Sequence, residues 1–116
     1  MHVGIRGSLY SELDLSEDAD MGFSIVHARD MDRLGADRVI EMIRERVGDA
    51  PVYISIDIDV LDPGFAPGTG TPEAGGLTSR DLLAMVRGFD GLRVIGGDLV
   101  EVSPPYDHAE ITAIVA

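Results

Sequence analysis

Short apolar runs alternate with amphipathic stretches along the chain, and this alternation predicts strands separated by helices. The apolar runs are rich in β-branched residues, which favours strands at residues 2–6, 23–28, 52–59 and within 92–102. Apolar residues recur at helical spacing from about Met31 or Leu34 to Val47, and again from Leu82 to Phe89. We expect the buried face of the second helix to consist of Leu82, Leu83, Met85, Val86 and Phe89. Strands that alternate with helices are typical of a parallel sheet. We therefore expect an α/β fold, with a parallel sheet and helices on both of its faces.

The segments between these elements predict two loops and two helix starts. Residues 9–22 are polar and acidic, which predicts a surface loop. Residues 62–76 contain five glycines and three prolines, and a long loop of this kind inside a compact domain is usually functional. Thr78 and Asp81 have the spacing of a capping box at the start of a helix. Asp107 is expected to cap a last helix that begins near His108.

The composition fits one packed domain over residues 1–116 and excludes several classes of protein. Hydrophobic residues make up 45% of the chain and the mean hydropathy is +0.12, so a core is expected. The absence of cysteine excludes disulfides, thiolate zinc sites and a cysteine nucleophile. A net charge of −12 argues against a nucleic-acid partner. We find neither an apolar run of membrane-spanning length nor a signal peptide, so we expect a cytoplasmic protein without a membrane partner.

Two carboxylates at the end of the predicted strand 52–59 are the clearest candidates for chemistry. Asp57 and Asp59 are two residues apart, so on a strand both side chains leave the same face, roughly 7 Å apart. Unpaired charges at the end of a buried strand are costly. A divalent cation with oxygen ligands, such as manganese or magnesium, removes that cost. The alternative is that both carboxylates pair with arginines.

Other polar residues near this strand are weaker candidates. Asp62 precedes Pro63 and a glycine, which predicts a turn former. An EF-hand calcium loop counted from Asp57 fails, because its fifth position is a leucine and its twelfth is a glycine. Glu101 ends an apolar strand and could bind substrate, support a ligand or form a structural ion pair. The histidines, at positions 2, 27 and 108, are expected to be structural or exposed, and no catalytic residue is predicted beyond the metal ligands.

Several motifs of the chain resemble those of the ureohydrolases, which include arginase and agmatinase. The resemblance rests first on the stretch Ser-Ile-Asp-Ile-Asp-Val-Leu-Asp-Pro at 55–63 and its Gly/Pro-rich sequel at 66–78. It extends to 100–104 and 106–112, and the last of these, together with 4–8, is most similar to the agmatinase branch. The resemblance therefore covers almost the whole chain.

The resemblance implies a fold, a reaction and roles for three residues. It implies an arginase-like three-layer α/β/α domain and hydrolysis of a guanidinium C–N bond to urea and an amine. Members of this family use two manganese ions (Mn²⁺), and the resemblance makes Asp57 a ligand that bridges both ions and Asp59 a ligand of one. It makes Glu101 the residue that holds the guanidinium substrate. It also implies a role in polyamine metabolism and a homo-oligomeric parent protein.

The chain departs from the family pattern in its histidine-bearing ligand segments. The family motifs Gly-Gly-Asp-His and Asp-Ala-His-x-Asp do not occur here, so half of the metal ligands are absent. We therefore expect the carboxyl-terminal portion of a ureohydrolase, a partial domain that alone binds manganese weakly and releases no urea. Two alternatives stay open: a sibling amidinohydrolase acting on guanidinobutyrate or a related compound, and a non-catalytic assembly module that keeps the fold.

Overall fold

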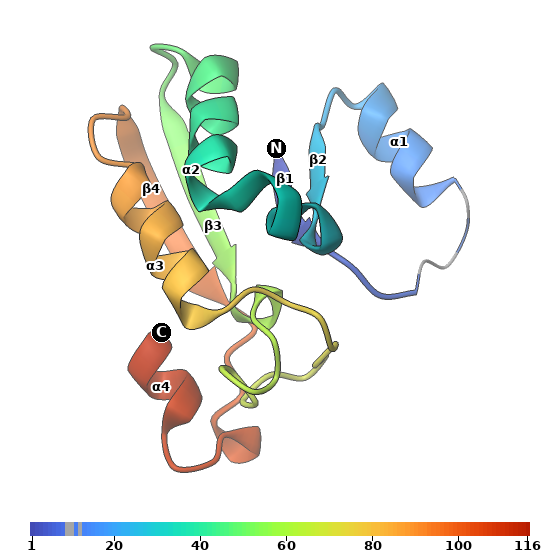
Figure 1. Ribbon diagram of the computed structural model, residues 1–116, viewed down its shortest axis with the longest axis vertical. Coiled ribbons are helices and arrows are strands. Elements are labelled where there is room, and N and C mark those ends of the chain that lie inside the picture. The colour runs from blue at the N-terminus through green and yellow to red at the C-terminus, as the bar shows by residue number, and fades with distance from the viewer. Residues whose placement is uncertain (9–10, 12) are drawn as a thin grey trace.

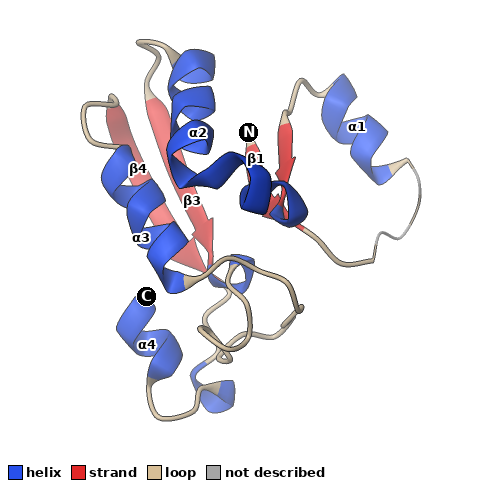
Figure 2. Ribbon diagram, in the orientation of Figure 1, coloured by secondary structure: helices blue, strands red, loops and turns tan. Residues whose placement is uncertain are grey.

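The computed structural model describes residues 1–8, 11 and 13–116, and strands and helices alternate along the chain (Figures 1 and 2). The strands are β1 (His2–Ile5), β2 (Ile25–His27), β3 (Val52–Asp57) and β4 (Val94–Val100). The helices are α1 (Asp14–Asp20), α2 (Ala28–Val47), α3 (Ser79–Gly88) and α4 (Ile111–Val115), with short 3₁₀ turns at Ile58–Val60 and Pro104–Tyr106. The α/β class predicted from the sequence is confirmed.

The strands form two parallel pairs. β1 pairs with β2, with Val3 opposite Val26, and β3 pairs with β4, with Asp57 opposite Val100. The parallel orientation is confirmed, but the described strands form two two-stranded sheets instead of one continuous sheet. The register of the second pair matters for function, because it brings the carboxyl ends of β3 and β4 to the same edge.

Helices α2 and α3 lie side by side over the β3–β4 pair (Figure 1). Their close approach depends on Gly88, where a Cβ would lie 2.3 Å from Cδ1 of Ile40 on α2. The predicted capping box starts α3, because the Thr78 hydroxyl accepts from the Asp81 N–H and the Asp81 carboxylate accepts from the Thr78 N–H. The buried core is apolar and comprises Val26, Ala28, Val39, Ile58, Leu61, Ala66, Leu77, Leu82 and Met85.

Helix α2 begins earlier than the periodicity predicts and has a kink. It starts at Ala28, and Gly35 has φ 71° and ψ 162°, which interrupts the helical backbone. A left-handed φ of this kind is accessible to glycine at little cost. Two helical segments therefore meet at Gly35, and the predicted start near Met31 or Leu34 lies within the first segment.

Two further expectations need correction. Residues 9–22 were expected to form a loop, but 14–20 form helix α1; residues 9, 10 and 12 lie outside the described part. On α3, Leu82 and Met85 are buried as expected, whereas Leu83 and Val86 are exposed. The first error has a simple cause, since seven residues without an apolar stripe give no helical periodicity to detect.

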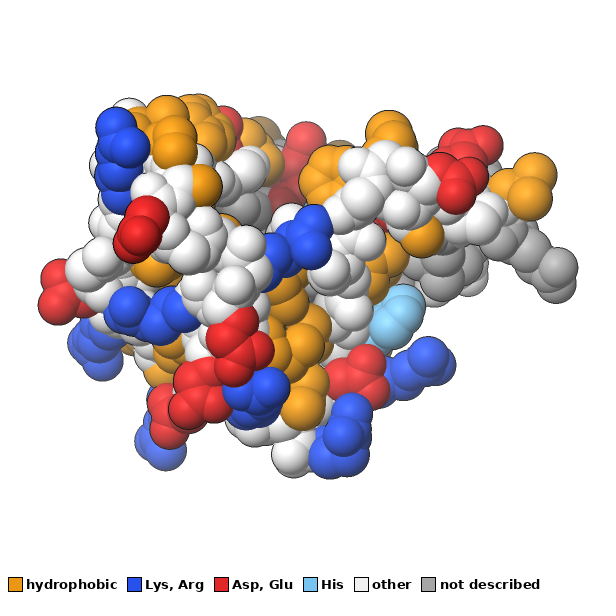
Figure 3. Space-filling model, turned by 90° about the horizontal axis from the view of Figure 1, so that it is seen from above, with side chains coloured by type: hydrophobic (Ala, Val, Ile, Leu, Met, Phe, Trp, Pro, Cys, Tyr) orange, Lys and Arg blue, Asp and Glu red, His pale blue; other side chains and the backbone are white. Residues whose placement is uncertain are grey.

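Apolar surface remains open on and between the two strand pairs. A cleft of about 1150 Å³ lies between β1 and β3, with Val3, Ile5, Ile54 and Ile56 among its lining residues. β4 is exposed along most of its length, and Ile95 retains 67% of its accessible surface. The view from above shows hydrophobic side chains at the surface among charged ones (Figure 3).

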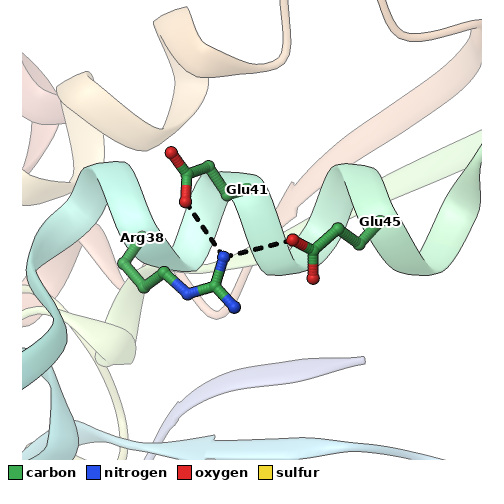
Figure 4. A network of polar contacts seen from close by, with 3 residues as sticks. All are labelled: Arg38, Glu41 and Glu45. Carbon is green, nitrogen blue, oxygen red and sulfur yellow. Dashed lines mark hydrogen bonds and ion pairs between the residues drawn. The ribbon is translucent and has the colours of Figure 1, made fainter.

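The charged surface of α2 carries a small ion-pair network (Figure 4). The Nη1 atom of Arg38 donates to a carboxylate oxygen of Glu41 at 2.9 Å and to one of Glu45 at 3.2 Å. All three side chains are about half exposed or more, so solvent weakens the attraction and the network contributes little to stability. No helix within the described ranges is both long and apolar enough to cross a bilayer.

Candidate metal and substrate site

Strand β3 ends at Asp57, two residues earlier than predicted, because the next residues turn into the core. Ile58 and Leu61 are both fully buried, with 0% and 1% of their surface exposed. A 3₁₀ turn places residues three apart on the same side, so the turn at Ile58–Val60 buries both side chains together. The expectation that Asp57 and Asp59 share one face of a strand is therefore wrong: Asp57 ends the strand, and Asp59 lies in the turn.

The turn nevertheless keeps these two carboxylates close to each other. Asp57 Oδ1 accepts from the Asp59 N–H at 3.0 Å, and Asp59 Oδ2 accepts from the Thr71 hydroxyl at 2.9 Å. Because Asp57 lies opposite Val100, Glu101 follows β4 at the same edge. Burial first, and then the charges of Asp59 and Glu101, raise the pKa of the Asp57 carboxyl above its ordinary value, although the N–H of Asp59 opposes this effect.

The chemistry of this cluster fits part of a divalent-metal site. The donors are carboxylate oxygens, which manganese and magnesium prefer. No ion pair joins Asp57 or Asp59 to a described arginine, so pairing with arginines is not found in that part of the chain. The described residues also contain no group of three or more histidines or carboxylates placed to hold a metal. Asp57 and Asp59 thus fit as a partial set of ligands.

Asp62 organises the long loop, as the sequence predicts for a turn former. Its Oδ1 accepts from the Gly64 N–H and its Oδ2 from the Gly75 N–H, both at 2.9 Å. These two bonds to the ionised form hold the pKa of the Asp62 carboxyl below its ordinary value. Asp62 therefore joins the two ends of the loop that brings Thr71 to Asp59.

Glu101 follows β4 with its side chain exposed and its backbone in an unfavourable conformation. Its φ is 62°, in the left-handed region where a residue with a Cβ is strained. Strained residues of this kind cluster at ligand sites, where the surrounding structure holds them. The strained backbone therefore supports the interpretation of Glu101 as a functional residue, which the sequence alone had suggested.

We expect Glu101→Gly to stabilise the chain relative to Glu101→Ala by about 1 kcal/mol, because glycine adopts this φ without strain. Both substitutions remove the charge beside Asp57, so their difference isolates the backbone conformation. Urea denaturation of the two variants measures this difference. Equal midpoints would show that Glu101 carries no backbone strain.

None of the three histidines joins a group of three or more metal-ligating side chains within the described residues. The His2 ring stacks on Phe23 with centroids 4.5 Å apart, and its Nε2 lies 3.9 Å from Asp18. His27 ends β2 and precedes α2. The His108 side chain is exposed, and its N–H donates to Asp107. The Asp107 carboxylate also accepts from the amides of Thr112 and Ala113, but α4 begins at Ile111 and its N-cap residue is Glu110, so the predicted start near His108 is wrong.

Sequence reasoning missed two residues that support the site. Thr71 binds the Asp59 carboxylate, and Arg6 binds the backbone of the turn that carries Asp59. An arginine directly after an apolar strand and before a glycine was the available signal for Arg6.

Comparison with known proteins places this geometry in a family context. The sequence model of the arginase family matches residues 1–116. The agmatinase of Escherichia coli O7:K1 is 52% identical over 99 residues, which are 85% of this chain and 32% of that protein. The guanidinopropionase of Pseudomonas aeruginosa is 47% identical over 115 residues, which are 99% of this chain and 36% of that protein.

A solved structure agrees with the sequence matches. The proclavaminate amidinohydrolase of Streptomyces clavuligerus superposes with a TM-score of 0.91 at 48% identity. The superposition covers 97% of this chain and 38% of the Streptomyces chain. The chain thus spans about a third of the length of the relatives that it matches.

Proposed function

The chain belongs to the arginase family, and from this premise we propose that it forms the carboxyl-terminal portion of a manganese-dependent amidinohydrolase. The proposed reaction cleaves a guanidinium C–N bond of an agmatine-like substrate and releases urea and an amine. Because the chain spans about a third of its relatives, we assign the activity to a protein of their full length. Relatives named guanidinopropionase, proclavaminate amidinohydrolase and agmatinase support this assignment.

The observation that carries the proposal is the carboxylate cluster at the ends of β3 and β4. Asp57 and Asp59 form no ion pair with an arginine in the described part of the chain, and Glu101 adds a third negative charge nearby. A cluster of this charge attracts two kinds of cation. A divalent metal suits Asp57 and Asp59, and a planar guanidinium suits Glu101, because a carboxylate can accept two parallel N–H bonds from it.

Each residue of the cluster has a defined part in the proposed mechanism. Asp57 and Asp59 would hold manganese, which when bound lowers the pKa of water and so supplies a nucleophile at neutral pH. Thr71 fixes one oxygen of Asp59 by donating to it, which orients the carboxylate. Glu101 accepts from the guanidinium and holds its carbon beside the ligands, which reduces the entropic cost of reaction.

A chimera tests the reaction. We expect residues 1–116 to support manganese-dependent urea release when they replace the matching segment of the Pseudomonas guanidinopropionase, with agmatine and guanidinopropionate as substrates. Asp57→Asn in the chimera should lower the rate roughly a thousandfold, because metal ions contribute several kcal/mol to such reactions. The isolated chain should release no urea.

Asp49→Asn is the matched control, since Asp49 is an exposed aspartate in the turn before the opposite end of β3. It should leave the rate of the chimera within about twofold, as expected for a surface substitution. Urea release that survives either chelation of manganese or Asp57→Asn would contradict the proposed function.

A further inference from the structure

Arg6 connects three separate segments of the chain at the edge of the carboxylate cluster. Its side chain extends from the end of β1, is half-buried, and donates only to backbone carbonyls among the described acceptors. Nη2 donates to the carbonyl of Asp59 at 2.5 Å and to that of Leu61 at 3.1 Å. The carbonyl of Glu73, in the long loop, accepts from Nη2 at 2.7 Å and from Nε at 3.1 Å.

These bonds complete the support of Asp59. Its N–H donates to Asp57 and its carboxylate accepts from Thr71, so both groups are fixed from the strand and the loop. Its carbonyl is the remaining backbone group, and Arg6 holds it. The same guanidinium holds Glu73, two residues after Thr71. Arg6 therefore fixes both the turn that carries Asp59 and the loop that orients its carboxylate.

Arginine suits this task better than lysine. A planar guanidinium presents five N–H donors in a fixed fork, so it can bind carbonyls of several segments at once. A lysine ammonium has three donors at one atom, so it lacks the Nε donor that gives the Glu73 carbonyl its second bond and the Nη1 donor that binds the Gly4 carbonyl. Arg6 also forms no ion pair with the Asp57 or Asp59 carboxylate within the described residues, which leaves their oxygens available for a cation.

We propose that Arg6 is a positioning residue that fixes the orientation of Asp59 relative to Asp57, and thereby sets the affinity of the two carboxylates for a divalent cation. The part concerning the cation rests on the proposed function, whereas the part concerning orientation does not. Removal of a residue that orients a metal ligand typically weakens metal binding 10- to 100-fold. We expect a loss of affinity of about this size when Arg6 is replaced.

The test compares Arg6→Met and Arg6→Lys with Arg44→Met. Arg44 also donates to backbone carbonyls, those of Gly88 and Asp90, but it connects α2 to the end of α3. The first measurement is amide hydrogen exchange without metal. Arg6→Met should raise the exchange rates of the Asp59 and Leu61 amides about tenfold, while the amides of β3 and β4 keep their protection. Arg6→Lys should raise the same two rates to a smaller extent. Arg44→Met should leave the Asp59 and Leu61 amides unchanged.

The second measurement is the Mn²⁺ affinity of the same variants in the chimera with the Pseudomonas guanidinopropionase, followed by the electron paramagnetic resonance signal of free Mn²⁺. Arg6→Met should weaken binding about tenfold or more, and Arg44→Met should leave it within twofold. Exchange at Asp59 and Leu61 that stays at the wild-type rate, or that rises equally throughout the chain, would overturn the positioning role. A wild-type chimera that binds no Mn²⁺ would instead contradict the proposed function, and the exchange data would still decide the role of Arg6.

Discussion

Replacement of Gly76 by alanine is expected to destabilise the folded chain by about 3 kcal/mol, the upper end of the usual cost of overpacking. A Cβ at this position would lie 2.4 Å from the backbone nitrogen of Asp62 and 2.5 Å from the carbonyl carbon of Leu61. Both are backbone atoms beside the turn that carries Asp59, so no side chain can move to relieve the contact. The two segments must separate, although Asp62 and Leu77 are joined there by a hydrogen bond.

Gly70→Ala is the matched control for this substitution. Gly70 lies in the same loop, and a Cβ there meets nothing within 4 Å among the described residues. We expect its effect on stability to stay within about 0.5 kcal/mol. Denaturant unfolding of both variants gives the comparison, and similar midpoints for the two would mean that Gly76 does not lie against the turn as described.

Ile58→Ala is expected to cost about 3 kcal/mol, because it removes three carbons from a fully buried side chain and leaves a cavity. Ile58→Val should cost only about 1 kcal/mol. The comparison that isolates burial is Ile114→Ala, since Ile114 is 81% exposed and should change stability by less than about 0.5 kcal/mol.

The effect of Ile58→Ala should reach the carboxylates, because Ile58 lies between Asp57 and Asp59 and its burial holds the turn. We expect faster amide exchange at Asp59 in this variant, in addition to the lower unfolding midpoint given by urea denaturation. A small change in both quantities would show that the turn is held by its hydrogen bonds and not by the buried isoleucine.

The patterns that predicted the fold correctly are those that depend on local periodicity and local hydrogen bonds. The alternation of strands and helices, the capping box at Thr78 and the Asp62 turn each follow from neighbours in the sequence. The end of β3 does not follow from its neighbours in the sequence, because Ile58 and Leu61 pack in a core formed by residues that are distant along the chain. Helix α1 also escaped detection, since it lacks an apolar stripe.

The sequence pointed to candidate ligands for the site but not to the residues that support them. Asp57, Asp59 and Glu101 were identified by residue type and by the family resemblance, and their roles stay predictions. Arg6 and Thr71 act through backbone and side-chain contacts with residues 53 and 12 positions away, which periodicity does not encode. The predicted homo-oligomer and cytoplasmic location also stay predictions.

The kink at Gly35 has a consequence for the accuracy of the site. The part of α2 before Gly35 lies beside β1 and β2, whereas Ile40 and Arg44, beyond it, contact α3 (Figure 1). Twelve residues from the kink to Val47 form a lever arm about 18 Å long. A rotation of about 5° at Gly35 would therefore displace the far end by roughly 1.6 Å. The two segments of α2 contact different parts of the chain, so the angle at Gly35 helps to set where β1, which leads into Arg6, lies relative to α3 and the strands that α3 covers.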